Sequence, residues 1–312
     1  MCCLFGMIDY GHTLNGKTMA RMLSALSAEC EARGTDATGI AYADNGRLCI
    51  YKKPLPAHKL RFYLPDRAHV IMGHTRMTTQ GSEKKNYNNH PFKGFAGKTP
   101  FALAHNGVLH NDISLRKTLK HPKTFIETDS YIAVQLLEQQ KALSFNSLKY
   151  MAEKVEGSFT FTVLDSHENL YIIKGDNPMC LFHFPQLGLY LYASTEEILS
   201  KAVKRMWLSF DKPVRIDIAC GDILRIDRGG QIDSSGFDTT NLFLSARYSW
   251  FYPGHHPVCT SRSAADNADK EYLSELKSVA ASFGYTSEDI DGLLQEGFST
   301  DELEELLYCG EL

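Results

Sequence analysis

The sequence is poor in the features that mark membrane, secreted and nucleic-acid-binding proteins. Among its 312 residues no apolar run reaches the roughly 18 residues needed to cross a bilayer. The opening Met1-Cys2-Cys3-Leu4-Phe5-Gly6 lacks the cationic lead and long apolar segment of a secretory signal. The formal net charge is -4, so no overall positive field favours nucleic acid or an anionic membrane as a ligand. We therefore expect a cytoplasmic protein with neither of these partners.

Cysteine is also too sparse and too scattered to build a disulfide framework. The 8 cysteines include no Cys-x-x-Cys pair, which favours a reducing compartment. His255-His256-x-x-Cys259 could offer three metal ligands, but no fourth ligand lies nearby. The Pro and Gly around this motif are typical of a solvated linker, and we predict no metal site.

Charge is distributed unevenly along the chain, and this divides it into parts. Residues 269–312 contain twelve Asp or Glu and two Lys, a net of -10; since the total is -4, residues 1–268 carry +6. Residues 253–267 contain breakers and small polar residues without apolar periodicity. We predict a main domain over 2–250, a linker over 251–268 and a small acidic domain over 269–312.

The acidic segment has the periodicity of short helices. Apolar stripes recur around Leu276, Ile290 and Leu303, and Thr286-x-x-Asp289 and Ser299-x-x-Glu302 have the pattern of capping boxes. A three-helix bundle is the prediction. Its acidity fits either a solvated face or a surface that docks onto the basic main domain or onto a partner.

The main domain alternates short strands with a few helices. Helical spacing is found from Met19 to Cys30, from about Thr128 to Leu137, and around 145–155, while Asp44-Asn45-Gly46 has the pattern of a hairpin turn. The order of strands, helices and strands predicts an α+β fold of two sheets with helices on them. Strands are predicted at 2–8, 39–42, 47–51, 69–73, 101–105, 159–164, 170–174, 181–184, 189–192 and 222–226.

Cys2 is the first residue that suggests chemistry. If Met1 is removed, Cys2 carries both a thiol and a free α-amine, whose reference pKa of about 7.7–8.0 lets it act as a base at neutral pH. No histidine is then needed to activate the thiol. The dipeptide alone favours the other interpretation, in which Cys2 and Cys3 are two small buried residues of a strand.

A series of motifs gives Cys2 a context. In order along the chain these are Met1-Cys2-x-Leu4-Phe5-Gly6, Arg33-Gly34-x-Asp36-x-x-Gly39, Gly73-His74-Thr75-Arg76-x-x-Thr79-x-Gly81, His90-Pro91, His105-Asn106-Gly107 and Thr128-Asp129-Ser130. Together they resemble the class II, N-terminal nucleophile type glutamine amidotransferase domain, as in glutamine-fructose-6-phosphate aminotransferase and amidophosphoribosyltransferase. The resemblance extends over roughly residues 2–230 and implies a four-layer αββα sandwich of two antiparallel sheets.

Arg76 and Asp129 have charges suited to the two ends of an amino acid. A guanidinium just past a strand can bind a carboxylate with two parallel hydrogen bonds, and a carboxylate can pair with an ammonium group. Local sequence alone also fits a surface salt bridge for Arg76 and a helix N-cap for Asp129. The resemblance implies that both hold the glutamate moiety of the substrate.

Asn106 and Gly107 follow an apolar strand. The asparagine amide and the glycine N–H could both donate to a carbonyl oxygen that becomes negative, and the resemblance implies this oxyanion hole. Asn-Gly is also a strong signal for a hairpin turn. Thr79 and the backbone of Met77 and Gln80 match a loop that closes over the substrate in members of the family.

The sequence departs from the family pattern at three positions. Cys3 stands where glycine is usual and could crowd Cys2 or take part in its oxidation. Met77 and Gln80 stand where tryptophan and histidine are common in aminosugar synthases, so the loop and any ammonia route could differ. Arg33 and Asp36 match as structural support.

The resemblance implies a glutaminase that uses Cys2, Asn106 and Gly107 without a cofactor. The roughly 80 residues after the amidotransferase-like part are too few for a synthase domain, which leaves the product acceptor open. A separate acceptor protein docked through the acidic helices is one possibility, and free glutamate and ammonia are another. A non-catalytic glutamine-binding protein and an amide hydrolase with another acyl donor remain alternatives.

Overall fold

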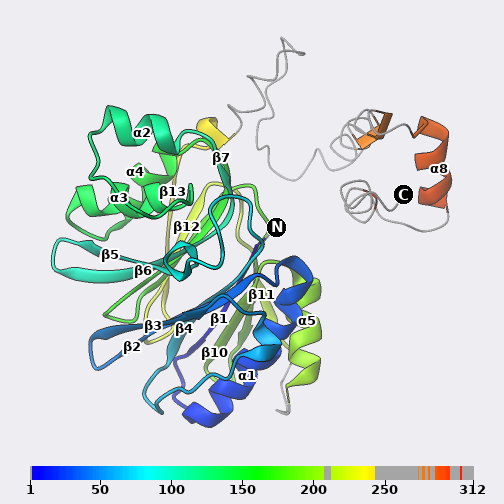
Figure 1. Cartoon of the computed structure of the whole chain (residues 1–312). Helices are drawn as coiled ribbons and strands as arrows, with labels where there is room; N and C mark the ends of the chain where they lie inside the picture. The colour runs from blue at the N-terminus through cyan, green and yellow to red at the C-terminus, as the bar shows by residue number, and fades with distance from the viewer. Residues whose placement is uncertain are drawn as a thin grey trace. The chain divides into compact units, whose positions relative to one another are not determined.

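The computed structural model describes residues 2–206 and 212–242 and, nearer the C-terminus, residues 273, 276–277, 280–281, 285–295 and 303. Contacts divide the chain into two compact units, Met1–His255 and His256–Leu312. Every strand pair in the first unit is antiparallel, and the strands form two sheets (Figure 1).

The first sheet has seven strands in the order β11-β9-β10-β1-β4-β2-β3. These are β1 (Cys3–Asp9), β2 (Ala37–Asp44), β3 (Arg47–Lys53), β4 (Val70–Arg76), β9 (Cys180–Phe184), β10 (Leu189–Ala193) and β11 (Val214–Ile216). The second sheet has six strands in the order β13-β12-β8-β7-β6-β5. These are β5 (Phe92–Ala96), β6 (Thr99–Leu109), β7 (Gly157–Asp165), β8 (Leu170–Lys174), β12 (Asp222–Ile226) and β13 (Ile232–Gly236).

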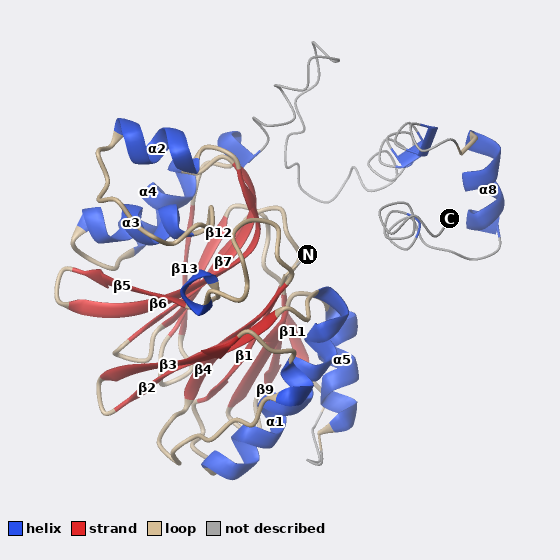
Figure 2. Cartoon of the chain, viewed as in Figure 1, coloured by secondary structure: helices blue, strands red, loops and turns tan. Residues whose placement is uncertain are grey.

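Helices cover the outer face of each sheet (Figure 2). The first sheet is covered by α1 (Gly16–Glu29) and α5 (Glu196–Arg205), and the second by α3 (Tyr131–Gln140) and α4 (Phe145–Lys154), with α2 (Asp112–Thr118) beside α3. Short 3₁₀ turns are η1 (Cys30–Arg33), η2 (Ala57–Lys59), η3 (Asn86–Asn88) and η4 (Thr240–Leu242). The prediction of two antiparallel sheets with flanking helices is confirmed.

Three apolar clusters hold these layers together. One packs α1 and α5 onto the first sheet, a second fills the space between the sheets, and a third packs α3 and α4 onto the second sheet. Strand β1 is buried along its whole length and contributes to two of them, because Phe5 and Met7 point to the helices while Leu4 and Ile8 point to the other sheet. Alternation along β1 therefore decides which side chains meet the second sheet.

The strands and the hairpin turn that the sequence predicts are found in the structure. Asn45 and Gly46 join β2 to β3 with φ angles of 52° and 72°, so the predicted hairpin turn is confirmed. Strands β5, β11 and β13 and helices α2 and α5 were not predicted. The signal for α5 was present, since the Thr195 hydroxyl accepts from the Ile198 N–H (3.3 Å) and Ile198, Leu199 and Ala202 form its buried face.

In the second unit, α8 (Ser287–Gln295) carries the middle of the three predicted stripes. Thr286 and Asp289 cap it reciprocally, as their spacing predicts, and Ile290 is buried with Leu276, Ala280 and Leu303. Several predicted features lie outside the described residues. These are the linker 251–268, the His255-His256-x-x-Cys259 motif, the Ser299-x-x-Glu302 box and most of the other two helices. Among the helices described, none is long and apolar enough to cross a membrane.

Candidate active site

Cys2 directly precedes β1 and is contacted by two segments, the η1 turn and the loop after β4. Its Sγ accepts a hydrogen bond from the Met77 N–H (3.4 Å) and lies 3.5 Å from the Met77 carbonyl oxygen. Alternation places the Cys2 side chain on the side of Leu4, toward the second sheet, whereas Cys3 is buried in the cluster under α1 together with Cys30. Cys3 therefore lies on the opposite face of the strand and does not crowd Cys2.

The environment of Cys2 favours the protonated thiol. Burial raises the pKa of this thiol, and the Asp129 charge raises it further, while the Met77 hydrogen bond and the Arg76 charge lower it. A base is therefore needed to remove the proton at neutral pH. The same electrostatic contributions indicate that the Arg76 and Asp129 charges act on one sulfur atom.

Arg33 and Asp36 hold the backbone around Cys2. Arg33 Nε donates to the Cys2 carbonyl oxygen (3.2 Å). The Asp36 N–H donates to the Arg76 carbonyl oxygen (3.0 Å), and its carboxylate accepts from the Thr78 N–H (2.7 Å). These contacts agree with the supporting position expected for both residues.

Arg76 ends β4 and is only 3% exposed. It faces the second sheet, because it alternates with Val70 and Met72, which belong to the cluster between the sheets. Nη1 donates to Asn89 Oδ1 (2.7 Å), and Nη2 donates to the carbonyl oxygens of Gln80 (2.5 Å) and Gly81 (3.2 Å). Within residues 2–206 and 212–242 no carboxylate forms an ion pair with Arg76, so the surface salt-bridge interpretation is wrong.

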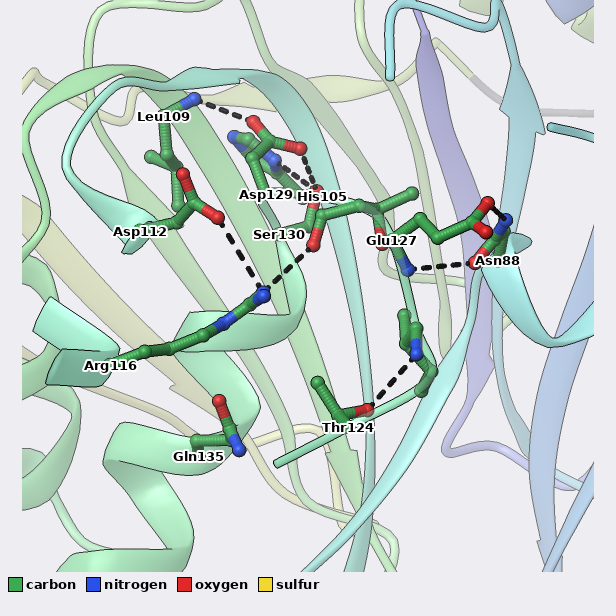
Figure 3. Close-up of polar contacts among 12 residues, drawn as sticks. Asn88, His105, Leu109, Asp112, Arg116, Thr124, Glu127, Asp129, Ser130 and Gln135 are labelled. Carbon is green, nitrogen blue, oxygen red and sulfur yellow. Dashed lines mark hydrogen bonds and ion pairs between the residues drawn. The ribbon is translucent and has the colours of Figure 1, made fainter. Parts of the chain in front are cut away.

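Asp129 lies in the turn before α3 and is nearly buried (Figure 3). Its Oδ2 accepts from the Leu109 N–H (2.6 Å), and its Oδ1 accepts from the Ser130 hydroxyl (3.2 Å). Ser130, not Asp129, precedes the first helical residue, Tyr131. The N-cap interpretation is therefore wrong: the Asp129 carboxylate instead binds the end of β6.

Asn106 and Gly107 lie inside β6, which continues to Leu109, so the interpretation as a hairpin turn is wrong. Asn106 is fully buried on the same strand face as Ala102 and Ala104, which point toward the first sheet. Neither its Nδ2 nor its Oδ1 has a hydrogen-bond partner among the described residues. Burying an amide without a partner is unfavourable, which marks this side chain as a candidate ligand group.

Gly107 cannot be replaced by a larger residue without moving the sheet. Its φ of 141° is rare for residues with a side chain, and an added Cβ would lie 1.9 Å from the Ser158 carbonyl oxygen of β7. The glycine thus lets β6 and β7 stay paired beside Asn106.

Met77, Thr79 and Gln80 form an exposed loop directly after Arg76. Met77 is 51% exposed although its backbone contacts Cys2. Through its carbonyl oxygen, Gln80 contacts the Arg76 guanidinium. Met77 therefore contacts the thiol and Gln80 contacts the guanidinium, while Thr79 lies between them in the same loop.

Two histidines lie behind this site in neutral form. Burial lowers the pKa of His74 to about 3, and it lowers that of His90 well below the usual range. The two rings lie with centroids 4.3 Å apart. Among the described residues, no group of three or more His, Cys, Asp or Glu is arranged to hold a metal ion.

Comparisons with known proteins identify the family of this domain. A family model described as a glutamine amidotransferase domain matches residues 74–201. The glutamine–fructose-6-phosphate aminotransferase of Bacillus thuringiensis subsp. konkukian is 32% identical over 157 residues, which cover 48% of this chain and 26% of that protein. The chain contains a class II glutamine amidotransferase domain.

Other relatives extend the amidotransferase match along the chain. The Bacillus licheniformis glutamine–fructose-6-phosphate aminotransferase is 26% identical over 249 residues, covering 75% of this chain and 40% of that protein. The match spans about a quarter to two fifths of these curated relatives. The structure of glutamine phosphoribosylpyrophosphate amidotransferase from B. subtilis shares the fold, with a TM-score of 0.58 and 18% identity over 76% of this chain and 49% of that one.

Sequence reasoning did not single out two residues that contact the site: Asn89, which contacts Arg76, and Leu109, which contacts Asp129. Ser130, which also contacts Asp129, belonged to a predicted motif but was given no role of its own. Leu109 acts through its backbone, which no side-chain pattern reveals. Asn89 stands in the loop before His90-Pro91, where its polarity was the only signal.

Proposed function

We propose that this amidotransferase domain hydrolyses the side-chain amide of glutamine to glutamate and ammonia, with Cys2 as the nucleophile. The observation that carries the proposal is that the Cys2 thiol accepts from the N–H of Met77, the residue after Arg76, and lies on the same side of the first sheet as the Arg76 side chain. The side-chain amide of Asn106, which has no hydrogen-bond partner among the described residues, also faces the space between the two sheets.

The two buried charges suit a small zwitterion. The Arg76 guanidinium binds the α-carboxylate, and the Asp129 carboxylate binds the α-ammonium group. Both are almost fully buried, where such contacts are stronger than at the surface. The loop carrying Met77, Thr79 and Gln80 covers the bound substrate and limits the access of water to it.

Catalysis proceeds through a thioester. The α-amine of Cys2, free once Met1 is removed, accepts the thiol proton as sulfur bonds to the amide carbon. Asn106 Nδ2 and the Gly107 N–H donate to the negative oxygen of the tetrahedral intermediate. The C–N bond then breaks, the proton passes from the amine to the leaving ammonia, and water hydrolyses the thioester to glutamate.

The fate of ammonia depends on a partner. The curated relatives are much longer than the match, and their names describe transfer to a sugar phosphate. We propose that a separate acceptor protein receives the ammonia here, docked through the acidic residues 269–312. Pull-down with and without residues 269–312 tests this: equal recovery of the acceptor protein from both would contradict it.

Glutamate release from glutamine, compared between Cys2→Ala and Cys3→Ala, tests the nucleophile. The two thiols are adjacent in sequence but lie on opposite faces of β1, so Cys3→Ala is a matched control. We expect loss of activity only for Cys2→Ala. Equal activity in both variants would refute the assignment.

The intact mass of the protein shows whether Met1 has been removed, and so helps to distinguish a catalyst from a glutamine-binding protein. Retained Met1 together with tight glutamine binding and no turnover would support a glutamine-binding protein. Processed Cys2 with weak glutamine turnover but rapid hydrolysis of another amide would support a different acyl donor.

A further inference from the structure

The Arg76 guanidinium is held by three oxygen atoms. Two are backbone carbonyl oxygens of the loop that follows it, those of Gln80 (2.5 Å) and Gly81 (3.2 Å). The third is the side-chain oxygen of Asn89, 2.7 Å from Nη1. Asn89 is therefore the only one of the three whose contact a substitution can remove.

Asn89 is itself fixed in orientation. It is 1% exposed, and its Nδ2 donates to the Glu83 carbonyl oxygen (2.8 Å) and to Asn86 Oδ1 (3.3 Å). These acceptors place the amide nitrogen away from Arg76 and so leave the oxygen facing the guanidinium. The backbone on each side is held as well, because Lys52 Nζ donates to the carbonyl oxygens of Asn89 and Pro91 (3.1 Å to the latter).

The absence of charge on the Asn89 side chain matters for the charge of Arg76 as much as its position does. A carboxylate in its place would pair with Arg76 and neutralise it, whereas an amide oxygen orients the guanidinium without cancelling its charge. No ion pair to Arg76 is formed elsewhere in the described part of the chain. Lys52, a second and half-buried cation, adds to the positive potential here; partial burial and the Arg76 charge lower its pKa to about 8.

We propose that Asn89 is a positioning residue for the carboxylate end of the substrate: its side-chain oxygen fixes the direction of the Arg76 guanidinium and leaves its positive charge for the α-carboxylate. The inference rests on the proposed function, since only a substrate with an α-carboxylate would use this arrangement. Asn89 does not touch the reacting amide, so its effect falls on binding of one end of the ligand.

Calorimetric binding of two ligands to Cys2→Ala protein tests this. One ligand is glutamine, and the other is 4-aminobutyramide, which is glutamine with hydrogen in place of the α-carboxylate. Adding Asn89→Ala should weaken glutamine binding about 10-fold or more, by the loss of one charge-assisted hydrogen bond. Binding of 4-aminobutyramide should change less than about twofold. Asn89→Asp, which keeps the shape but neutralises Arg76, should have at least as large an effect on glutamine alone.

Asn86→Ala is the matched control, because Asn86 contacts Asn89 but not Arg76. We expect it to leave the binding of both ligands within about twofold. Equal weakening of both ligands by Asn89→Ala, or no weakening of glutamine, would overturn the positioning role while the proposed function stands. Failure of Cys2→Ala protein to bind either ligand would refute the proposed function itself, and this inference with it.

Discussion

Replacement of Asn106 by leucine should make the protein more stable and nearly inactive. The side chain is fully buried, and neither atom of its amide has a hydrogen-bond partner within residues 2–206 and 212–242. A buried amide without a partner costs about 1–3 kcal/mol. Leucine has the same branched shape and number of side-chain heavy atoms, so Asn106→Leu should raise the free energy of unfolding by about 1 kcal/mol or more.

The same change removes a donor to the oxyanion. Loss of one such donor lowers kcat by about 100- to 1000-fold in comparable sites. Urea unfolding followed by fluorescence, together with glutamate release at saturating glutamine, measures both effects on the same preparation. Stability and activity should move in opposite directions.

Thr160 provides the matched control, since it lies directly across from Asn106 in the β6–β7 register and is equally buried. Its hydroxyl donates to the Asn177 carbonyl oxygen (2.7 Å), so Thr160→Val should lower stability by about 1 kcal/mol and leave turnover nearly unchanged. Destabilisation of similar size in both variants, or wild-type turnover in Asn106→Leu, would refute the reasoning about a free amide.

Three further predictions concern pH and backbone geometry. The pH dependence of kcat/KM should rise with a midpoint of about 8, as the α-amine of Cys2 loses its proton; a midpoint of about 6.5 would indicate an imidazole base instead. The pKa of His74 is about 3 in the folded protein and 6.5 in the unfolded chain. Between these pH values the unfolded chain binds more protons, so the free energy of unfolding falls as the pH drops, by up to about 4–5 kcal/mol. His74→Gln, which keeps a donor for the His105 carbonyl oxygen, should flatten the pH dependence of urea unfolding, and an unchanged slope would contradict this. Gly107→Ala should lower turnover more than about 100-fold, because the new Cβ would lie 1.9 Å from the Ser158 carbonyl oxygen. Gly46→Ala, also at positive φ but with open space around it, should lower only stability. Similar turnover in the two variants would argue against a role for backbone position at Gly107.

The sequence predicted most of the strands and most of the helix faces because burial imposes a period on them, but it did not predict β5, β11 and β13. It could not distinguish two identical dipeptides. Asn45-Gly46 forms a hairpin turn, while Asn106-Gly107 continues a strand. Pairing of β6 with β7 over Leu109 to Phe101 decides the second case, and that pairing depends on residues some fifty positions away.

The candidate site was predicted through motifs rather than through physical pattern. Arg76 and Asp129 fitted surface roles locally, and only the fold shows that both are buried. Asn89 belongs to an irregular loop, where no periodicity predicts which atoms its side chain meets. Such contacts become visible only once the loop has a three-dimensional course.

The placement of Cys2 and Cys3 on opposite faces of β1 has a practical consequence. An electrophile shaped like an amino acid would meet one sulfur and be screened from its neighbour by the strand itself. Covalent labelling could then report pocket occupancy at a single position. Conversely, position 3 is free to vary with the packing beneath α1, without disturbing the chemistry one residue away.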